Sequence, residues 1–200
     1  MTLYNGSGAF ARYLQSAGNL TYGPSFDVDL RGWDFNNLAT FNATNSSAAT
    51  GSGSVRIFVP QPGGGFPVAS TGATQCVNIP GPGTYTLTGR GLPTGNFANG
   101  TAAVIQWVMR SNPGAASGCT SANATSTGDL FLPSNWELPS NPATIATSPG
   151  QWTNNTTIEI RLNVRQGGIN QSPTLTANFD EISLTGVADA GGLPFANGFE

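Results

Sequence analysis

The side chains that could do acid–base chemistry in this sequence are carboxylates, because histidine and lysine are both absent. Without histidine there is no Ser-His-Asp or Cys-His pair and no imidazole ligand for a metal ion. Without lysine there is no Schiff base and no phosphate-binding P-loop lysine. The remaining route to catalysis is a pair of carboxylates of the kind glycosidases use, about 5–10 Å apart.

The acidic residues do not form an obvious catalytic pair. Asp180 and Glu181 are neighbours, so in a regular strand their side chains point to opposite faces of the sheet. Asp27 and Asp29 share a face, but Arg31 beside them indicates a salt-bridged surface. The sequence therefore predicts that the chain is not an enzyme. Three further carboxylates are candidate partners for such a pair: Asp129, Glu137 and Glu159.

The overall charge excludes other classes of partner. The formal net charge is −3 and every basic side chain is an arginine, so the clustered cations that nucleic-acid binding needs are missing. No stretch approaches the ~20 apolar residues of a membrane span. No signal peptide is recognisable at the start, so we expect the mature form of a secreted protein.

The two cysteines, Cys76 and Cys119, have two interpretations. In a reducing compartment they would be idle thiols. In an exported protein a bridge between them would close a loop of about 43 residues and add about 4 kcal/mol in the chain-entropy model. We expect the bridge and an extracellular location.

Strands must position these residues, because 27 glycines and 14 prolines divide the chain into segments too short for long helices. The first strands are expected within Leu3–Asn5 and Phe26–Phe35. Period-2 alternation and β-branched residues predict five more: Ser54–Val59, Tyr85–Arg90, Ala102–Arg110, Thr156–Val164 and Leu175–Leu184. With turn signals every 8 to about 15 residues, this pattern predicts an all-β jelly-roll sandwich of two antiparallel sheets. We expect one domain over residues 1–187 and a Gly-rich C-terminal tail over residues 188–200.

The longest apolar strand, Ala102–Arg110, separates its candidate binding residues between two faces. Trp107 alternates with apolar neighbours, which favours packing in the core, although it remains a candidate ligand contact. Gln106 and Arg110 lie on the opposite face, either in a solvated surface or along a polar groove.

The order of motifs along residues 3–186 resembles bacterial extracellular jelly rolls of the family 4/9 carbohydrate-binding-module type. The closing strand, an aromatic followed by two acids and alternating apolar residues, is the most specific part of the resemblance. The motifs that carry it are Gly32–Trp33, Gly51–Ile57, Gln75–Val77, Tyr85–Thr88, Trp107, Gly118–Thr120, Gln151–Trp152 and Asn178–Leu184.

The resemblance implies roles for two pairs of residues. In such modules a Gln-Cys strand is commonly joined to a later cysteine, which would pair Cys76 with Cys119. The acid at the position of Asp180 often helps to hold a structural calcium, and Glu181 would add oxygen ligands. The alternative is that both acids end a strand in solvent.

The resemblance also implies glycan recognition, in which aromatic rings stack on sugars. Trp136 is the best candidate because it lies in a predicted exposed loop. Trp33 and Trp152 occupy positions that look structural in the family. The prediction is a non-catalytic module that attaches to a glycan of unspecified class. The alternative is a self-associating extracellular structural or adhesive subunit, with homo-oligomer contacts through the terminal segments.

Overall fold

The fold is taken from a computed structural model of the chain. It describes residues 19–26, 30, 32–46, 52–60, 68–94, 102–111, 119, 124–153, 156–166 and 174–188. Within these ranges the regular secondary structure is entirely β, with ten strands. The described part of the chain holds no helix long and apolar enough to cross a membrane.

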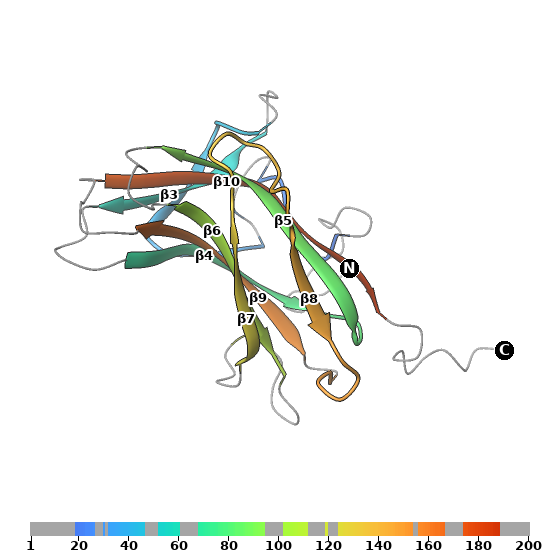
Figure 1. Cartoon of the computed structure of the whole chain (residues 1–200). Helices are drawn as coiled ribbons and strands as arrows, with labels where there is room; N and C mark the ends of the chain where they lie inside the picture. The colour runs from blue at the N-terminus through green and yellow to red at the C-terminus, as the bar shows by residue number, and fades with distance from the viewer. Residues whose placement is uncertain are drawn as a thin grey trace, which may run out of the picture.

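Two five-stranded sheets face each other (Figure 1). The β9 sheet has the order β1-β4-β9-β6-β7, and the β10 sheet has the order β2-β3-β10-β5-β8. All the neighbouring strands are antiparallel, which confirms the predicted jelly-roll sandwich. The strands of the β9 sheet are β1 Asp34–Phe35, β4 Val68–Asn78, β6 Ala102–Arg110, β7 Ala124–Phe131 and β9 Thr157–Gln166. Those of the β10 sheet are β2 Ala39–Asn42, β3 Ser54–Pro60, β5 Gly83–Thr94, β8 Ala143–Thr147 and β10 Thr174–Ala188.

The core lies between the sheets and follows from the alternation. On β9, every second residue from Ile158 to Val164 is buried in the core cluster. Phe179 of β10 and Tyr85 of β5 pack into the same core from the other sheet. The residues between these positions point outward, so the pattern that builds the core also fixes which side chains reach the surface.

Within the predicted strand Phe26–Phe35 the structure describes Phe26, Leu30 and residues 32–35, and among these only Asp34 and Phe35 pair as a strand. Phe26 has a φ of 46° and Gly32 a φ of 90°, and left-handed backbone at these positions interrupts an extended chain. The Phe26 ring packs on Trp33, with 5.4 Å between the centroids, so both aromatics are part of the core.

Other predictions fall outside the described residues, among them the strand Leu3–Asn5 and nearly all of the tail over residues 188–200. The strand pattern did not predict β2, β7 or β8, nor β4, of which only Gln75–Val77 entered through the resemblance. β7 and β8 each pair with only one neighbour, and they are rich in Ala, Ser, Thr and Gly rather than alternating apolar residues.

Candidate functional site

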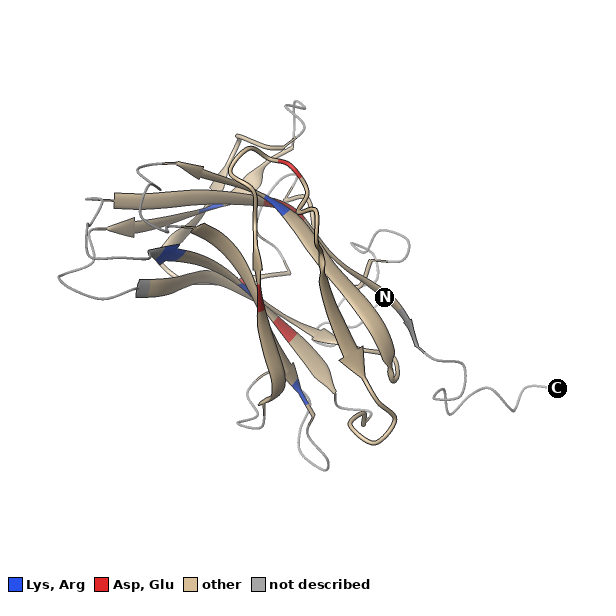
Figure 2. Cartoon of the chain, in the orientation of Figure 1, with Lys and Arg blue, Asp and Glu red and all other residues tan. Residues whose placement is uncertain are grey.

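Charged residues are few in this chain, 7 basic and 10 acidic, yet five of them form one connected group on the outer surface of the β9 sheet. Figure 2 shows acidic and basic positions gathered on the strands of this sheet. The register places their side chains on the same face, pointing away from the core. We call this group the polar face: Gln106, Arg110, Asp129, Glu159, Arg161 and Arg165.

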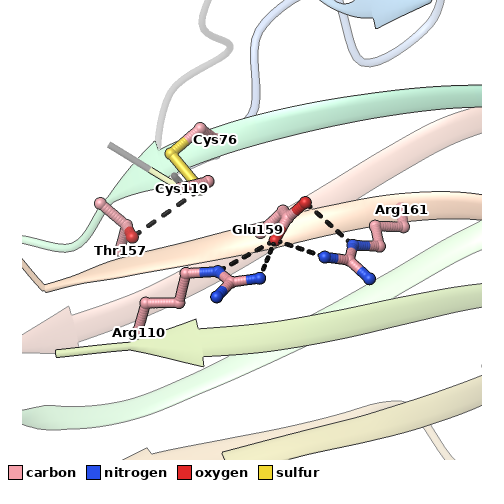
Figure 3. The surroundings of a disulfide bond; sticks show 6 residues. All are labelled: Cys76, Arg110, Cys119, Thr157, Glu159 and Arg161. Carbon is pink, nitrogen blue, oxygen red and sulfur yellow. Dashed lines mark hydrogen bonds and ion pairs between the residues drawn. A yellow bond between two sulfur atoms is a disulfide. The ribbon is translucent and has the colours of Figure 1, made fainter. Parts of the chain in front are cut away.

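At one end of the polar face, Glu159 of β9 lies between two arginines (Figure 3). Arg110 donates to its Oε2 from Nη2 at 2.8 Å, and Arg161 donates to its Oε1 from Nε at 2.9 Å. The side chains of Arg110 and Glu159 are each only 12% exposed. Burial alone would raise the pKa of Glu159, but hydrogen bonds and charge from Arg161 and Arg110 outweigh it and lower the pKa. Glu159 is therefore a firmly ionised carboxylate.

The network continues from β9 across β6 to β7. Arg161 donates to the amide oxygen of Gln106 at 3.4 Å, and the Gln106 amide nitrogen donates to Asp129 at 3.3 Å. Arg165 completes it with two hydrogen bonds of 2.7 Å to the two oxygens of Asp129. Positive, amide and negative groups thus alternate over three neighbouring strands.

The disulfide lies beside the Glu159 end of the polar face. Cys76 of β4 is bonded to Cys119, as predicted, and Cys76 is the register partner of Glu159. The Cys119 sulfur is also 3.7 Å from the Thr157 hydroxyl of β9. In sequence, Cys119 follows β6 and precedes β7, but the bond attaches it to β4, on the far side of β9. The disulfide therefore ties the β6–β7 connection to the opposite half of the sheet.

The structure brings together two of the predicted ligand residues, Gln106 and Arg110, in this network. It separates Trp107 from them, because Trp107 points inward and packs against the core. A Cβ added to Gly128, its partner on β7, would lie 2.7 Å from the indole ring. The absence of a side chain at Gly128 thus leaves the space that the Trp107 ring occupies.

Trp136 lies in the segment that joins β7 to β8, apart from the polar face. It is partly buried and has a φ of 62°. Its backbone is fixed to β5, because its N–H donates to the Gly91 carbonyl at 3.1 Å and its carbonyl accepts from Arg90 at 2.7 Å. Its contact with a ligand stays a prediction.

Asp180 and Glu181 do not point to opposite faces as a regular strand would require. A β-bulge interrupts β10 here and Glu181 has a φ of 50°, so both carboxylates reach Ser46. The Ser46 N–H donates to Asp180 at 2.8 Å, and its hydroxyl donates to Glu181 at 2.7 Å. Arg90 donates to the other Glu181 oxygen at 2.6 Å. We call this group the Ser46 clasp.

The pKa values of the two acids of the Ser46 clasp are shifted in opposite directions. Burial raises the pKa of Asp180, which is 1% exposed, and the charge of Glu181 adds to the rise although backbone N–H groups oppose it. Burial also acts to raise the pKa of Glu181, but the Ser46 hydroxyl and Arg90 outweigh it and lower that pKa.

A calcium ion at Asp180 and Glu181 would have few free oxygen ligands among the described residues. A calcium ion takes six to eight oxygen ligands. Both carboxylates already accept hydrogen bonds, one of them from a guanidinium, and no group of three or more acidic or thiol ligands occurs among the described residues. Calcium would have to share or replace these donors, so its presence remains a prediction.

Several residues on this outer surface were not predicted to bind a ligand, although Asp129 and Glu159 were named as candidate partners of a catalytic pair. Glu159 and Arg161 were recognisable as the outward positions of an alternating strand. Asp129, Arg165 and Phe131 were not, because their proximity depends on the pairing of β6 with β7 and β9, which are distant in sequence.

No protein-family model matches the sequence, and no curated protein matches it. Among solved structures, one similar to this chain is a family 61 carbohydrate-binding module in complex with beta-1,4-galactotriose. It is 13% identical, the match covers 84% of this chain and 99% of that one, and the TM-score is 0.51. A putative sugar-binding protein from Bacteroides thetaiotaomicron is 10% identical over 84% of this chain and 100% of its own, with a TM-score of 0.48. A family 4 carbohydrate-binding module is 14% identical over 82% and 100%, with a TM-score of 0.45. The chain has the jelly-roll β-sandwich fold of carbohydrate-binding modules.

Proposed function

We propose that the chain is a non-catalytic module that binds a glycan through the polar face of the β9 sheet. The observation that carries this proposal is the connected network from Arg110 through Glu159, Arg161 and Gln106 to Asp129 on one outer surface. Guanidinium, carboxylate and amide groups in such proximity match the donors and acceptors of sugar hydroxyls.

Stability explains the buried Glu159 end of the network better than it explains the end at Asp129. Ion pairs that remain partly exposed contribute about 0–1 kcal/mol each. The Arg165–Asp129 pair, with both side chains 27% exposed, belongs to this class. The Arg165–Asp129 end of the network therefore adds little to the stability of the fold, which supports a role for it in binding. The galactotriose complex of the family 61 module is one example of this fold serving a glycan.

The state of the carboxylates supports binding rather than hydrolysis. A glycosidase needs a general acid whose pKa is raised so that it holds a proton near neutral pH. The pKa of Glu159 is lowered, and both oxygens of Asp129 accept from Arg165. Glu159 is therefore not suited to donate a proton to a leaving group.

An extracellular location completes the proposal, because a disulfide persists in oxidising compartments. The alternative of a self-associating subunit rests on terminal segments outside the described residues. No observation on the described residues favours it over glycan binding.

Gel electrophoresis through a panel of soluble polysaccharides tests the proposal. The chain should be retarded by at least one of them, and Arg161→Ala should abolish the retardation, because Arg161 links Glu159 to Gln106. Arg56→Ala is the matched control. Arg56 lies on β3, and its partner on β10 is Asn178, so the control removes the same side chain from the other sheet.

Retention of binding in Arg161→Ala together with its loss in Trp136→Ala would assign the glycan to the β7–β8 segment instead. Retardation by no polysaccharide, with the fold intact, would contradict the proposed function.

A further inference from the structure

We propose that Phe131, Asp129 and Arg165 form the subsite that receives one sugar ring of a neutral, soluble glycan. This inference rests on the proposed function and names the part of the polar face that holds the ring. Sugar recognition ordinarily combines an aromatic surface with hydrogen-bonding groups at its edge. The polar face must therefore offer an aromatic side chain, and no tryptophan provides one: Trp33, Trp107 and Trp152 pack in or against the core, and Trp136 lies on the β7–β8 segment.

Among the described residues, Phe131 of β7 is the exposed aromatic side chain on the outer surface that carries the polar face. It is 57% exposed, although it belongs to a strand of the sandwich. Phe35 and Phe41 are also exposed, but their register partners are core residues, so they lie at sheet edges on the inward side. Phe58 is exposed on the outer surface of the other sheet.

The surroundings of Phe131 place hydrogen-bonding groups next to the ring. Asp129 precedes it by two residues on β7, so both side chains point to the same side of the sheet. The Arg165 guanidinium carbon lies over the Phe131 ring, 5.9 Å from its centroid, so a sugar would stack on the opposite face of this exposed ring. Two of the Arg165 nitrogens donate to Asp129 at 2.7 Å. A ring, a carboxylate and a guanidinium thus meet at the open edge of the sheet.

The arginine in this group is not fully satisfied. The Nε atom of Arg165 is buried and has no hydrogen-bond acceptor. An unpaired buried donor is costly, and a partly exposed ion pair returns little stability. Stability therefore does not account for the position of Arg165 beside Phe131, whereas a role of its partly exposed guanidinium in binding does.

The chemistry of the subsite selects the class of sugar. The C–H face of a pyranose stacks on an aromatic ring, and adjacent hydroxyls suit a carboxylate and a guanidinium side by side. The Arg165–Asp129 pair has no net charge, and the carboxylate of a uronic acid would meet Asp129. One exposed ring also fits one sugar of a soluble chain rather than the flat surface of a crystalline polysaccharide.

Calorimetric titration with neutral oligosaccharides and with uronate-containing ones of the same length tests the inference. Phe131→Ala should weaken binding of the neutral ligand about tenfold or more, and Phe131→Trp should retain it. Phe58→Ala is the matched control, since it removes a similarly exposed phenylalanine from the other sheet, and its affinity should equal that of the wild type. The melting temperatures of the three variants verify that each is folded.

The outcomes separate the two proposals. Unchanged binding in Phe131→Ala, with loss in Arg161→Ala, would overturn this subsite and leave the proposed function standing. Stronger binding of uronate-containing ligands would overturn the assigned sugar class. Absence of binding to any oligosaccharide by the wild type would remove the proposed function itself.

Discussion

At the scale of single residues, the position of the Glu159 carboxylate between two guanidinium groups decides its charge. Arg110 and Arg161 hold it ionised in a site where only 12% of its side chain is exposed. The same contacts fix the arginines in place. Glu159 therefore acts as a positioning residue for the donors of the polar face.

Glu159→Gln should lower the free energy of unfolding at pH 7 by about 1–3 kcal/mol, because two charge-assisted hydrogen-bonding partners lose their anion. The pKa of Glu159 is lower in the folded protein than the value of about 4.3 in an unfolded chain. Its stabilisation is therefore present above that value and is lost as the pH falls through the folded pKa. Urea unfolding of both proteins should show a difference that is largest near pH 7 and shrinks toward pH 3.

Glu137→Gln is the control for this experiment, because it removes the same charge from an exposed segment. Its effect should stay within about 0.5 kcal/mol at every pH. A Glu159→Gln difference that does not change with pH would show that its ion pairs are not the source of the stability.

Calcium at the Ser46 clasp is tested by thermal unfolding with calcium and with a chelator. If the ion is bound, the chelator should lower the melting temperature of the wild type, because a ligand that binds only the folded state stabilises it. In Asp180→Asn the two conditions should then give equal melting temperatures. Equal temperatures in the wild type would instead assign both carboxylates to Ser46 and Arg90 alone.

At the scale of elements, the pairing of β7 with β6 leaves the space that the Trp107 ring occupies, because Gly128 of β7 has no side chain. Gly128→Ala should destabilise the protein by about 1–3 kcal/mol, because the new methyl group would lie 2.7 Å from the Trp107 ring. Gly150→Ala is the control, since nothing lies within 4 Å of the added methyl group. Urea unfolding should leave the Gly150 variant close to the wild type. Equal stability of both variants would show that the indole does not pack on β7.

The disulfide links β4 to the connection between β6 and β7. Replacing Cys76 and Cys119 together by alanine should lower the free energy of unfolding by about 4 kcal/mol for the 43-residue separation. Urea unfolding measures this difference. A reductant should destabilise the wild type similarly and leave the double variant unchanged. A wild type insensitive to reductant, once its thiols are shown to be free, would contradict the stabilising role.

The sequence allowed β6 and the outward face of β9 to be predicted, because a strand that covers a core must alternate. Alternation cannot show which strands become neighbours, so Asp129 and Phe131 of β7 were not recognised beside Arg165. It also cannot show a bulge, which turned Asp180 and Glu181 toward the same serine.

At the scale of the whole molecule, the sandwich presents two outer surfaces of different character. The outer surface of the β10 sheet carries threonines at three alternate positions of β5 from Thr84 to Thr88. The outer surface of the β9 sheet carries the polar face and Phe131. On the proposed function, the glycan binds the second surface alone.

Mapping the glycan by NMR chemical-shift changes in the labelled protein tests this claim most directly. Titration with a bound neutral oligosaccharide should shift the signals of outward residues on β6, β7 and β9, including the side chains of Gln106, Arg161 and Arg165. Signals of β3 and β5 should stay in place. Changes confined to the segment around Trp136, or to the β10 sheet, would contradict glycan binding on the β9 sheet.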